Sequence, residues 1–186
     1  MPSLYHDNFT KNILDKSYSK VWDSAVREWI IVDVEEDEEL ESSCICGKEN
    51  LKYLYTIKNS KNGESIYPIG SSCIKKFGNK DMDEYTKITE DLFRLLHTIK
   101  DKRYINLDSN YFSRKILKYL FDKGAFQPNQ YNNYNGREDY NFMLQMFNKI
   151  NKDDITPKQK KKINGIIIGS IRPFLEELIE EKITRR

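Results

Sequence analysis

The spacing of apolar residues changes from helical to extended early in the chain. Within residues 8–32, apolar side chains recur about four residues apart, and they line one face of a predicted helix. These side chains are Val21, Trp22, Ala25, Val26 and Trp29. Residues 29–34, WIIVDV, are rich in β-branched side chains and predict that the helix gives way to a short strand. We expect the acidic run that follows to be a loop.

A β-hairpin is predicted next. Apolar and polar side chains alternate in LKYLYTIK (51–58), which is typical of a half-buried strand. Asn62-Gly63 is a strong reversal signal, and SIYPIG returns as a second strand. Pro68 has no N–H group, so it favours an edge strand or a bulge. Ser71 or Ser72 could cap a short helix that ends at Gly78.

The rest of the chain has the pattern of four helices. The first opens at Asp81 or Asp83, and the second covers about 109–123. The third carries Tyr140, Met143, Leu144 and Phe147. The fourth starts with Thr156 as N-cap and Pro157 in its first position, and Pro173 should kink or break it near Ile171 or Arg172. We therefore predict a helix-rich α+β protein: a small β-hairpin module like a zinc knuckle in residues 1–80, then a helical bundle in 81–186.

All three cysteines lie in the hairpin module. Cys44 and Cys46 share a tight turn in which Gly47 permits a positive φ, and Cys73 follows the hairpin at the start of the short helix. A helix start favours a thiolate, because its dipole and free N–H groups stabilise negative charge. This arrangement resembles half of a treble-clef knuckle, so the three thiols are candidate ligands of a structural Zn²⁺ ion.

Zinc usually takes four ligands, and only three thiols are present. The fourth ligand would be His6, His97, a carboxylate such as Glu49, a partner or water. Neither histidine has ligand spacing to the cysteines. The alternative is a hairpin core with three buried thiols and no metal.

The net charge of +2 hides an asymmetry. Residues 33–41, DVEEDEELE, hold seven of the 29 acidic residues, so the rest of the chain carries 31 basic and 22 acidic side chains. The run could contact a basic partner surface, or it could be a solvated loop beside a lysine-rich surface. The candidate partner-binding acids are Glu35, Glu36, Asp37, Glu38 and Glu39.

Basic and aromatic side chains gather in the helical half. Four lysines occupy the first turns of the fourth helix, where they oppose the helix dipole. They could contact phosphate or an acidic protein groove, or form a solvated face. The loop QYNNYNGREDY could stack its tyrosines on unpaired bases, or be an ordinary turn. The candidates are Lys158, Lys160, Lys161, Lys162, Tyr131, Tyr134 and Arg137.

Several features argue against other classes of protein. Residues 1–20 lack the apolar segment of a signal peptide, and no window of the sequence is apolar enough to span a membrane. Three cysteines cannot all pair within one chain, so reduced thiols in a cytoplasm are expected. No P-loop, G-x-G-x-x-G, H-E-x-x-H or nucleophile elbow is present, so we do not expect an enzyme.

The segment AVREW…CICG…LYTIKNSKNGESIYPIGSSCIKKF, within residues 25–77, resembles short proteins of bacteriophages and mobile elements of low-GC bacteria. They share a Trp-bearing helix, a C-x-C-G turn, a hydrophobic hairpin and an I-G-S-x-C-I-K-x-F close. A looser likeness covers residues 140–163. Where such proteins carry a histidine directly after C-x-C-G, this chain has Lys48. The resemblance implies a phage origin and the cytoplasm of a bacterial host.

Two functions are compatible with this sequence. The first is a non-catalytic inhibitor of a host defence nuclease of the Cas9 type, as in anti-CRISPR proteins, with the acidic run mimicking a phosphate backbone. Its partner would be the nuclease or its nucleoprotein complex. The alternative is a DNA- or RNA-binding accessory protein for phage replication, recombination or transcription, in which the lysines carry the affinity.

Overall fold

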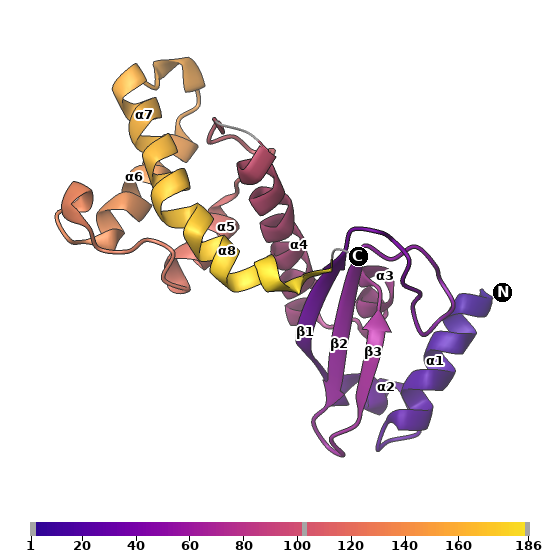
Figure 1. The fold of residues 1–186 in the computed structure, drawn as a ribbon. Helices are drawn as coiled ribbons and strands as arrows, with labels where there is room; N and C mark the ends of the chain where they lie inside the picture. Colours follow the sequence, from indigo (N-terminus) through magenta and orange to yellow (C-terminus); the bar gives the residue numbers. More distant parts are fainter. Residues whose placement is uncertain (1–2, 102–103, 185–186) are drawn as a thin grey trace. The chain divides into compact units, whose positions relative to one another are not determined.

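A computed structural model describes residues 3–101 and 104–184 (Figure 1). The chain divides into two units, each with its own contacts. The N-terminal unit comprises Met1–Lys87 with Lys182–Arg186, and the helical unit comprises Ile88–Glu181. The first unit contains a sheet and short helices, and the second is helical, which confirms the predicted α+β class. Helix α4 (Lys80–Asp101) belongs to both units.

The sheet of the N-terminal unit has the strand order β3-β2-β1-β4. Strands β1 (Trp29–Asp37), β2 (Tyr53–Asn59) and β3 (Ser65–Ile69) are antiparallel to their neighbours, and β4 (Ile183–Thr184) runs parallel to the end of β1. Gly63, with φ of +79°, turns the chain between β2 and β3. Pro68 lies in β3, an edge strand, as predicted.

The acidic run is not the loop that its composition predicted. Residues Glu35, Glu36 and Asp37 form the last part of β1, where Glu36 pairs with Tyr53 of β2 and with Ile183 of β4. Pairing on both sides supplies partners for the backbone at this end of the strand. The carboxylate of Glu36 lies 3.3 Å from Lys52 Nζ, and that of Asp37 accepts a 2.6 Å hydrogen bond from Ser42 Oγ. Long-range pairing therefore overrides local composition here.

The start of the chain also differs from prediction. Instead of one helix through Trp29, it forms α1 (Leu4–Lys16) and the four-residue α2 (Trp22–Ala25). Trp29 is the first residue of β1, as the WIIVDV pattern allowed, and Val21 is exposed. Phe9 of α1 packs edge-on against Trp22 and Phe77, at ring-centroid distances of 6.0 and 5.4 Å. This aromatic cluster thus packs α1 against α2 and against the 3₁₀ turn that contains Phe77.

The hairpin leads into α3 (Ser71–Ile74), as the sequence predicted. This helix contacts β2, and a single 3₁₀ turn extends it to Gly78, whose φ is +63°. The first turns of α4 also reach β2, because Tyr55 Oη donates to the Thr86 carbonyl at 3.5 Å. The 3₁₀ turns of the chain are η1 (Val26–Glu28), η2 (Lys75–Phe77), η3 (Gln130–Asn132), η4 (Lys152–Asp154) and η6 (Glu180–Lys182).

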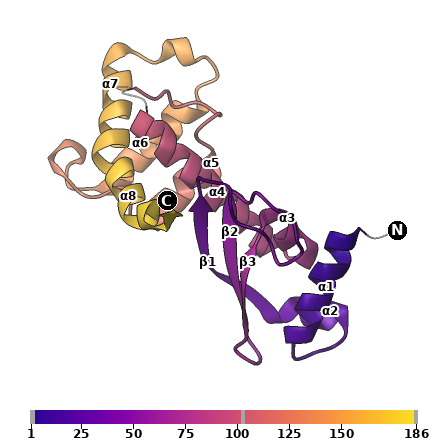
Figure 2. The ribbon, with the colours of Figure 1, turned by 45° about the vertical axis from the view of Figure 1, so that its right-hand side comes forward.

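The helical unit continues α4 with α5 (Arg114–Asp122), α6 (Gly136–Asn148), α7 (Pro157–Ile166) and α8 (Arg172–Ile179) (Figure 2). Thr156 caps α7 as predicted, with Thr156 Oγ1 accepting from Gln159 N at 3.3 Å and Gln159 Oε1 accepting from Thr156 N at 3.0 Å.

Pro173 does not break the last helix. A π-helical segment, η5 (Ile167–Ile171), joins α7 to α8 without interruption. A proline ring clashes with the carbonyl four residues earlier in an α-helix, here that of Gly169. Gly169 lies in the wider π turn, so its carbonyl does not have the α-helical position in which it would clash with the ring of Pro173.

Glu28 connects separate segments of the N-terminal unit through its buried carboxylate. It accepts hydrogen bonds from the backbone N–H groups of Tyr18 (2.8 Å) and Ser19 (2.9 Å) and from Asn59 Nδ2 (2.8 Å). Burial raises the pKa of this carboxyl, but the hydrogen bonds from Asn59, Ser19 and Tyr18 together outweigh burial. The pKa of Glu28 therefore lies below its usual 4.5, and the folded state favours the charged form.

We expect Glu28→Gln to lower the free energy of unfolding at neutral pH by about 2 kcal/mol, because an amide accepts weaker hydrogen bonds than a carboxylate. The pKa is lower in the folded than in the unfolded state, so this stabilisation is complete above the unfolded value of 4.5 and disappears as pH falls through the folded value. Urea unfolding at several pH values should show that the variant loses less stability in acid than the parent. Glu64→Gln, at an exposed site in the hairpin, is the control. Equal acid sensitivity in parent and Glu28→Gln would contradict this role.

Candidate functional sites

The turn that carries Cys44 and Cys46 is closed by its own backbone. Cys44 N donates to the Lys48 carbonyl and Gly47 N donates to the Cys44 carbonyl, both at 2.8 Å. Gly47 has a φ of +94°, a conformation that side chains with a Cβ rarely adopt. Ile45 N donates to the Pro68 carbonyl at 3.1 Å, which attaches the turn to β3. The hydrogen bonds within the turn and its attachment to β3 therefore together fix where the two thiols point.

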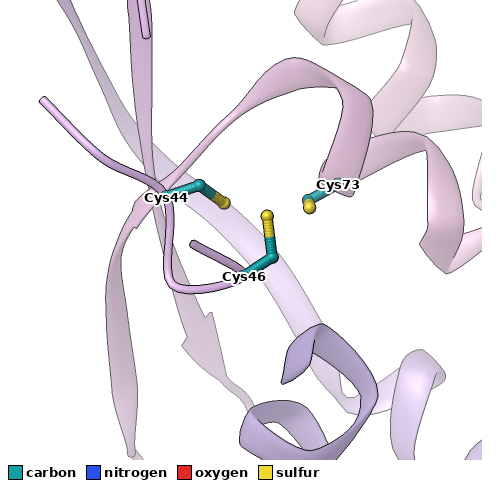
Figure 3. A group of neighbouring side chains, drawn as sticks. All are labelled: Cys44, Cys46 and Cys73. Atoms are coloured by element: carbon teal, nitrogen blue, oxygen red, sulfur yellow. The ribbon is translucent and has the colours of Figure 1, made fainter. Parts of the chain in front are cut away.

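Cys73 reaches the same place from α3. The three sulfur atoms all lie within 4.8 Å of one another, and Figure 3 shows them facing a common point. All three side chains are buried, and none forms a disulfide. The structure thus brings together Cys44, Cys46 and Cys73, as the sequence predicted.

The surroundings of the thiols favour one negative charge among them. The Cys73 thiol donates to the Cys44 sulfur and, despite the opposing effect of burial, lowers the pKa of Cys44 to about 5, with help from the N–H groups of Cys46 and Gly70. Gly70 N lies 3.4 Å from Cys44 Sγ. The same hydrogen bond and burial raise the pKa of Cys73. A thiolate is the form of cysteine that binds a metal.

The geometry fits a small thiophilic ion. A zinc ion bound at its usual sulfur distance holds tetrahedral sulfurs about 3.8 Å apart, within the observed limit of 4.8 Å. The thiols also line a cavity of about 130 Å³ together with Lys48 and Lys52. Within the described residues, no histidine or carboxylate joins the three sulfurs at this centre. A fourth ligand would therefore come from water or a partner.

The candidate acidic residues do not form one exposed surface. Glu36 and Asp37 are buried, with 0% and 4% of their surface exposed, so the prediction that they contact a partner is wrong. Their carboxylates instead serve the fold, by pairing with Lys52 and with Ser42. Glu35 is half-buried and accepts a hydrogen bond from Tyr67 Oη at 2.9 Å. Glu38 and Glu39 are exposed.

Four of the seven basic and aromatic candidates share one cavity in the helical unit. This cavity, the α7 pocket, has a volume of about 610 Å³. It is lined by Asn129, Tyr131, Asp139, Lys158, Lys161, Lys162, Gly165, Ile166, Gly169 and Ser170. Lys160 lines a different cavity with Lys152. Arg137 lies over the Phe121 ring at 5.2 Å, and neither it nor Tyr134 is among the residues that line the α7 pocket.

Sequence reasoning missed the two glycines of the α7 pocket. Steps of three or four residues lead from Lys158 to Lys161 or Lys162, and from there to Gly165 and Gly169. Residues with this spacing fall on one face of a helix. This spacing was the available signal, since it separates Lys160 from the other three lysines.

No described helix is both long and apolar enough to cross a membrane. Comparisons with protein-family models, curated proteins and solved structures find no match to this chain. The resemblance to phage proteins therefore stays a prediction, and functional arguments depend on the sites themselves.

Gly47→Ala tests whether the turn sets the position of the thiols. A Cβ at this φ costs about 1–2 kcal/mol, so the turn should relax and affinity for Zn²⁺ or Co²⁺ should fall about tenfold. Competition with a chromophoric chelator would measure affinity, and the sulfur-to-cobalt absorption band would report the ligand geometry. Gly63→Ala is a matched control, because Gly63 also has a positive φ but lies in the β2–β3 turn. It should lower stability without changing metal affinity, and equal loss of affinity in both variants would contradict the prediction.

Proposed function

We propose that the protein is a non-catalytic binding protein whose N-terminal unit is stabilised by a structural zinc ion. One observation carries this proposal: three buried sulfurs from two separated segments lie within 4.8 Å of one another. Thiolates select soft or borderline ions, and cysteines supply most of the four ligands that zinc commonly takes in small structural modules. Burial of the three ligands favours a structural role over an exchangeable catalytic one.

A metal here would connect parts of the unit that are far apart in sequence. The turn with Cys44 and Cys46 lies between β1 and β2, whereas Cys73 lies in α3, after β3. The unfolded chain does not hold these two segments together, so the ion would bind the folded unit far more tightly than the unfolded chain. Metal binding should therefore contribute directly to folding.

We also infer that the protein binds nucleic acid, and we prefer this hypothesis to the one in which its acidic run mimics a phosphate backbone. The mimicry hypothesis needs a continuous acidic surface, and burial of Glu36 and Asp37 removes two of its five candidates. Tyr131 and three of the four candidate lysines, in contrast, line one pocket. This grouping supports the DNA- or RNA-binding alternative. A host defence nuclease or its nucleoprotein complex as partner stays a prediction.

Metal analysis would test the zinc proposal directly. Protein purified under reducing conditions should contain one zinc per chain, and Cys46→Ser should retain little. Free zinc at a hundred times its dissociation constant should stabilise the folded state by about 2.7 kcal/mol. Chelation should accordingly lower the melting temperature of the parent protein and leave that of Cys46→Ser nearly unchanged.

Ser43→Ala provides a control for this experiment, since Ser43 is an exposed neighbour of Cys44. It should bind zinc as the parent does. If the parent protein bound no zinc and melted at the same temperature with and without chelator, the three thiols would be a metal-free part of the core.

A further inference from the structure

Part of the wall of the α7 pocket is bare helix surface. It lies in the helical unit, and its volume of about 610 Å³ falls in the range of small-ligand sites. A Cβ built on Gly165 or on Gly169 would meet no atom within 4 Å apart from the backbone of its own helix, so the helix surface is uncovered at both positions. Glycine is a poor helix former, and two in one helix reduce its intrinsic stability. Because the two glycines have no side chains, the helix surface at these positions can accept a planar group such as a nucleobase.

An aromatic side chain also lines the α7 pocket. Tyr131 has 82% of its surface exposed, yet the loop that carries it is firmly held. Asn132 is fully buried, and its side chain accepts from Asn129 N at 2.8 Å and donates to Asp139 Oδ2 at 2.8 Å. Asn129 Oδ1 in turn accepts from Tyr131 N at 2.8 Å. Such anchoring lowers the entropic cost of using Tyr131 as a stacking platform.

Cations border the same pocket. Lys162 is partly neutralised, because its Nζ lies 3.4 Å from Asp139 Oδ1 and 4.6 Å from the centre of the Phe142 ring. Within the described chain, Lys158 and Lys161 take part in no ion pair, and both are exposed. They stand in the first turns of α7, where positive charge opposes the helix dipole. Helix stability therefore does not explain them, whereas an anionic ligand would.

We propose that the α7 pocket binds a nucleotide unit of single-stranded nucleic acid. The base lies between Tyr131 and the surface at Gly165 and Gly169, and the adjoining phosphodiester groups contact Lys158 and Lys161. Every base has a π face, so stacking gives affinity with little sequence preference. A duplex keeps its bases stacked in the helix and cannot place one in the pocket. An acidic peptide would use the lysines, but it has no need of an exposed aromatic ring and a bare helix surface in the same pocket.

Fluorescence anisotropy with labelled oligonucleotides tests the proposal on the full-length protein. Single-stranded DNA and RNA of about 12 nucleotides should bind at about 50 mM salt, and more tightly than a duplex of the same length or a polyglutamate peptide. Affinity should fall with salt, and loss of each contacting lysine should reduce the slope of log K against log salt by about 0.7. Adenosine or thymidine monophosphate should compete only weakly, because it lacks the neighbouring phosphates.

Matched variants separate the pocket from the general charge of the chain. Tyr131→Ala should weaken binding about tenfold, whereas Tyr134→Ala, in the same loop but not among the lining residues, should change it less than twofold. Lys158→Ala and Lys161→Ala should weaken binding and lower the salt slope. Lys160→Ala removes the same charge from the same helix at a residue that lines the other cavity, and it should have little effect.

Gly165→Leu distinguishes loss of binding from loss of folding. Leucine is a better helix former and enters open space, so the melting temperature should hold or rise while oligonucleotide binding is lost. Three results would overturn the proposal. The first is that single strands do not bind at low salt, and the second is that Lys160→Ala and Lys161→Ala weaken binding equally. The third is that duplex, polyglutamate or mononucleotide binds more tightly than a single strand. This inference rests on the nucleic-acid function proposed above, and tighter binding of duplex would overturn the inference while leaving that function in place. The zinc proposal concerns the other unit, so it can fail independently of both.

Discussion

Three sulfur atoms that start from distant points in the sequence converge in the N-terminal unit, and they meet only when the turn, the hairpin and α3 are all in place. Cys44 and Cys46 are placed by a turn with a positive φ at Gly47, and Cys73 by a helix that follows the hairpin. Each placement needs the sheet between them, because the turn is attached to β3 through Ile45 and α3 contacts β2. The hairpin therefore acts as the frame that brings three separate thiols into one buried cluster.

The elements that depend on interactions between residues close in the sequence could be predicted from the sequence. The hairpin turn at Asn62-Gly63 and the capping box at Thr156 both follow from interactions within a few residues. The end of β1 could not be predicted in this way, because its acidic composition favours a loop. Glu36 is extended because Tyr53 and Ile183 pair with it from distant segments. Burial of its carboxylate beside Lys52 is a consequence of that pairing.

Only some of the residues of the α7 pocket could be identified from composition, and the others needed the helical period. Composition identified the lysines and the tyrosine-rich loop, but it treated Lys160 as equivalent to its neighbours. The helical period separates them, and it places Gly165 and Gly169 beside the other lysines. Pro173 was predicted to kink or break the helix near Ile171 or Arg172 by a rule for α-helices, whereas the π segment Ile167–Ile171 changes the geometry to which the rule applies. Residue type alone therefore located the site only in part.

The short strand β4 makes the N-terminal unit discontinuous in sequence. Ile183 and Thr184 return to the outer side of β1, where Lys182 also forms an ion pair with Asp33, so the helical unit is an insertion between two pieces of one sheet. A fragment ending near residue 87 would leave the outer edge of β1 without β4, and a bare edge is a template for pairing with other chains. Residues 183 and 184 must also be synthesised before this sheet can be completed. The helical unit, whose residues are contiguous, has all of its sequence available earlier.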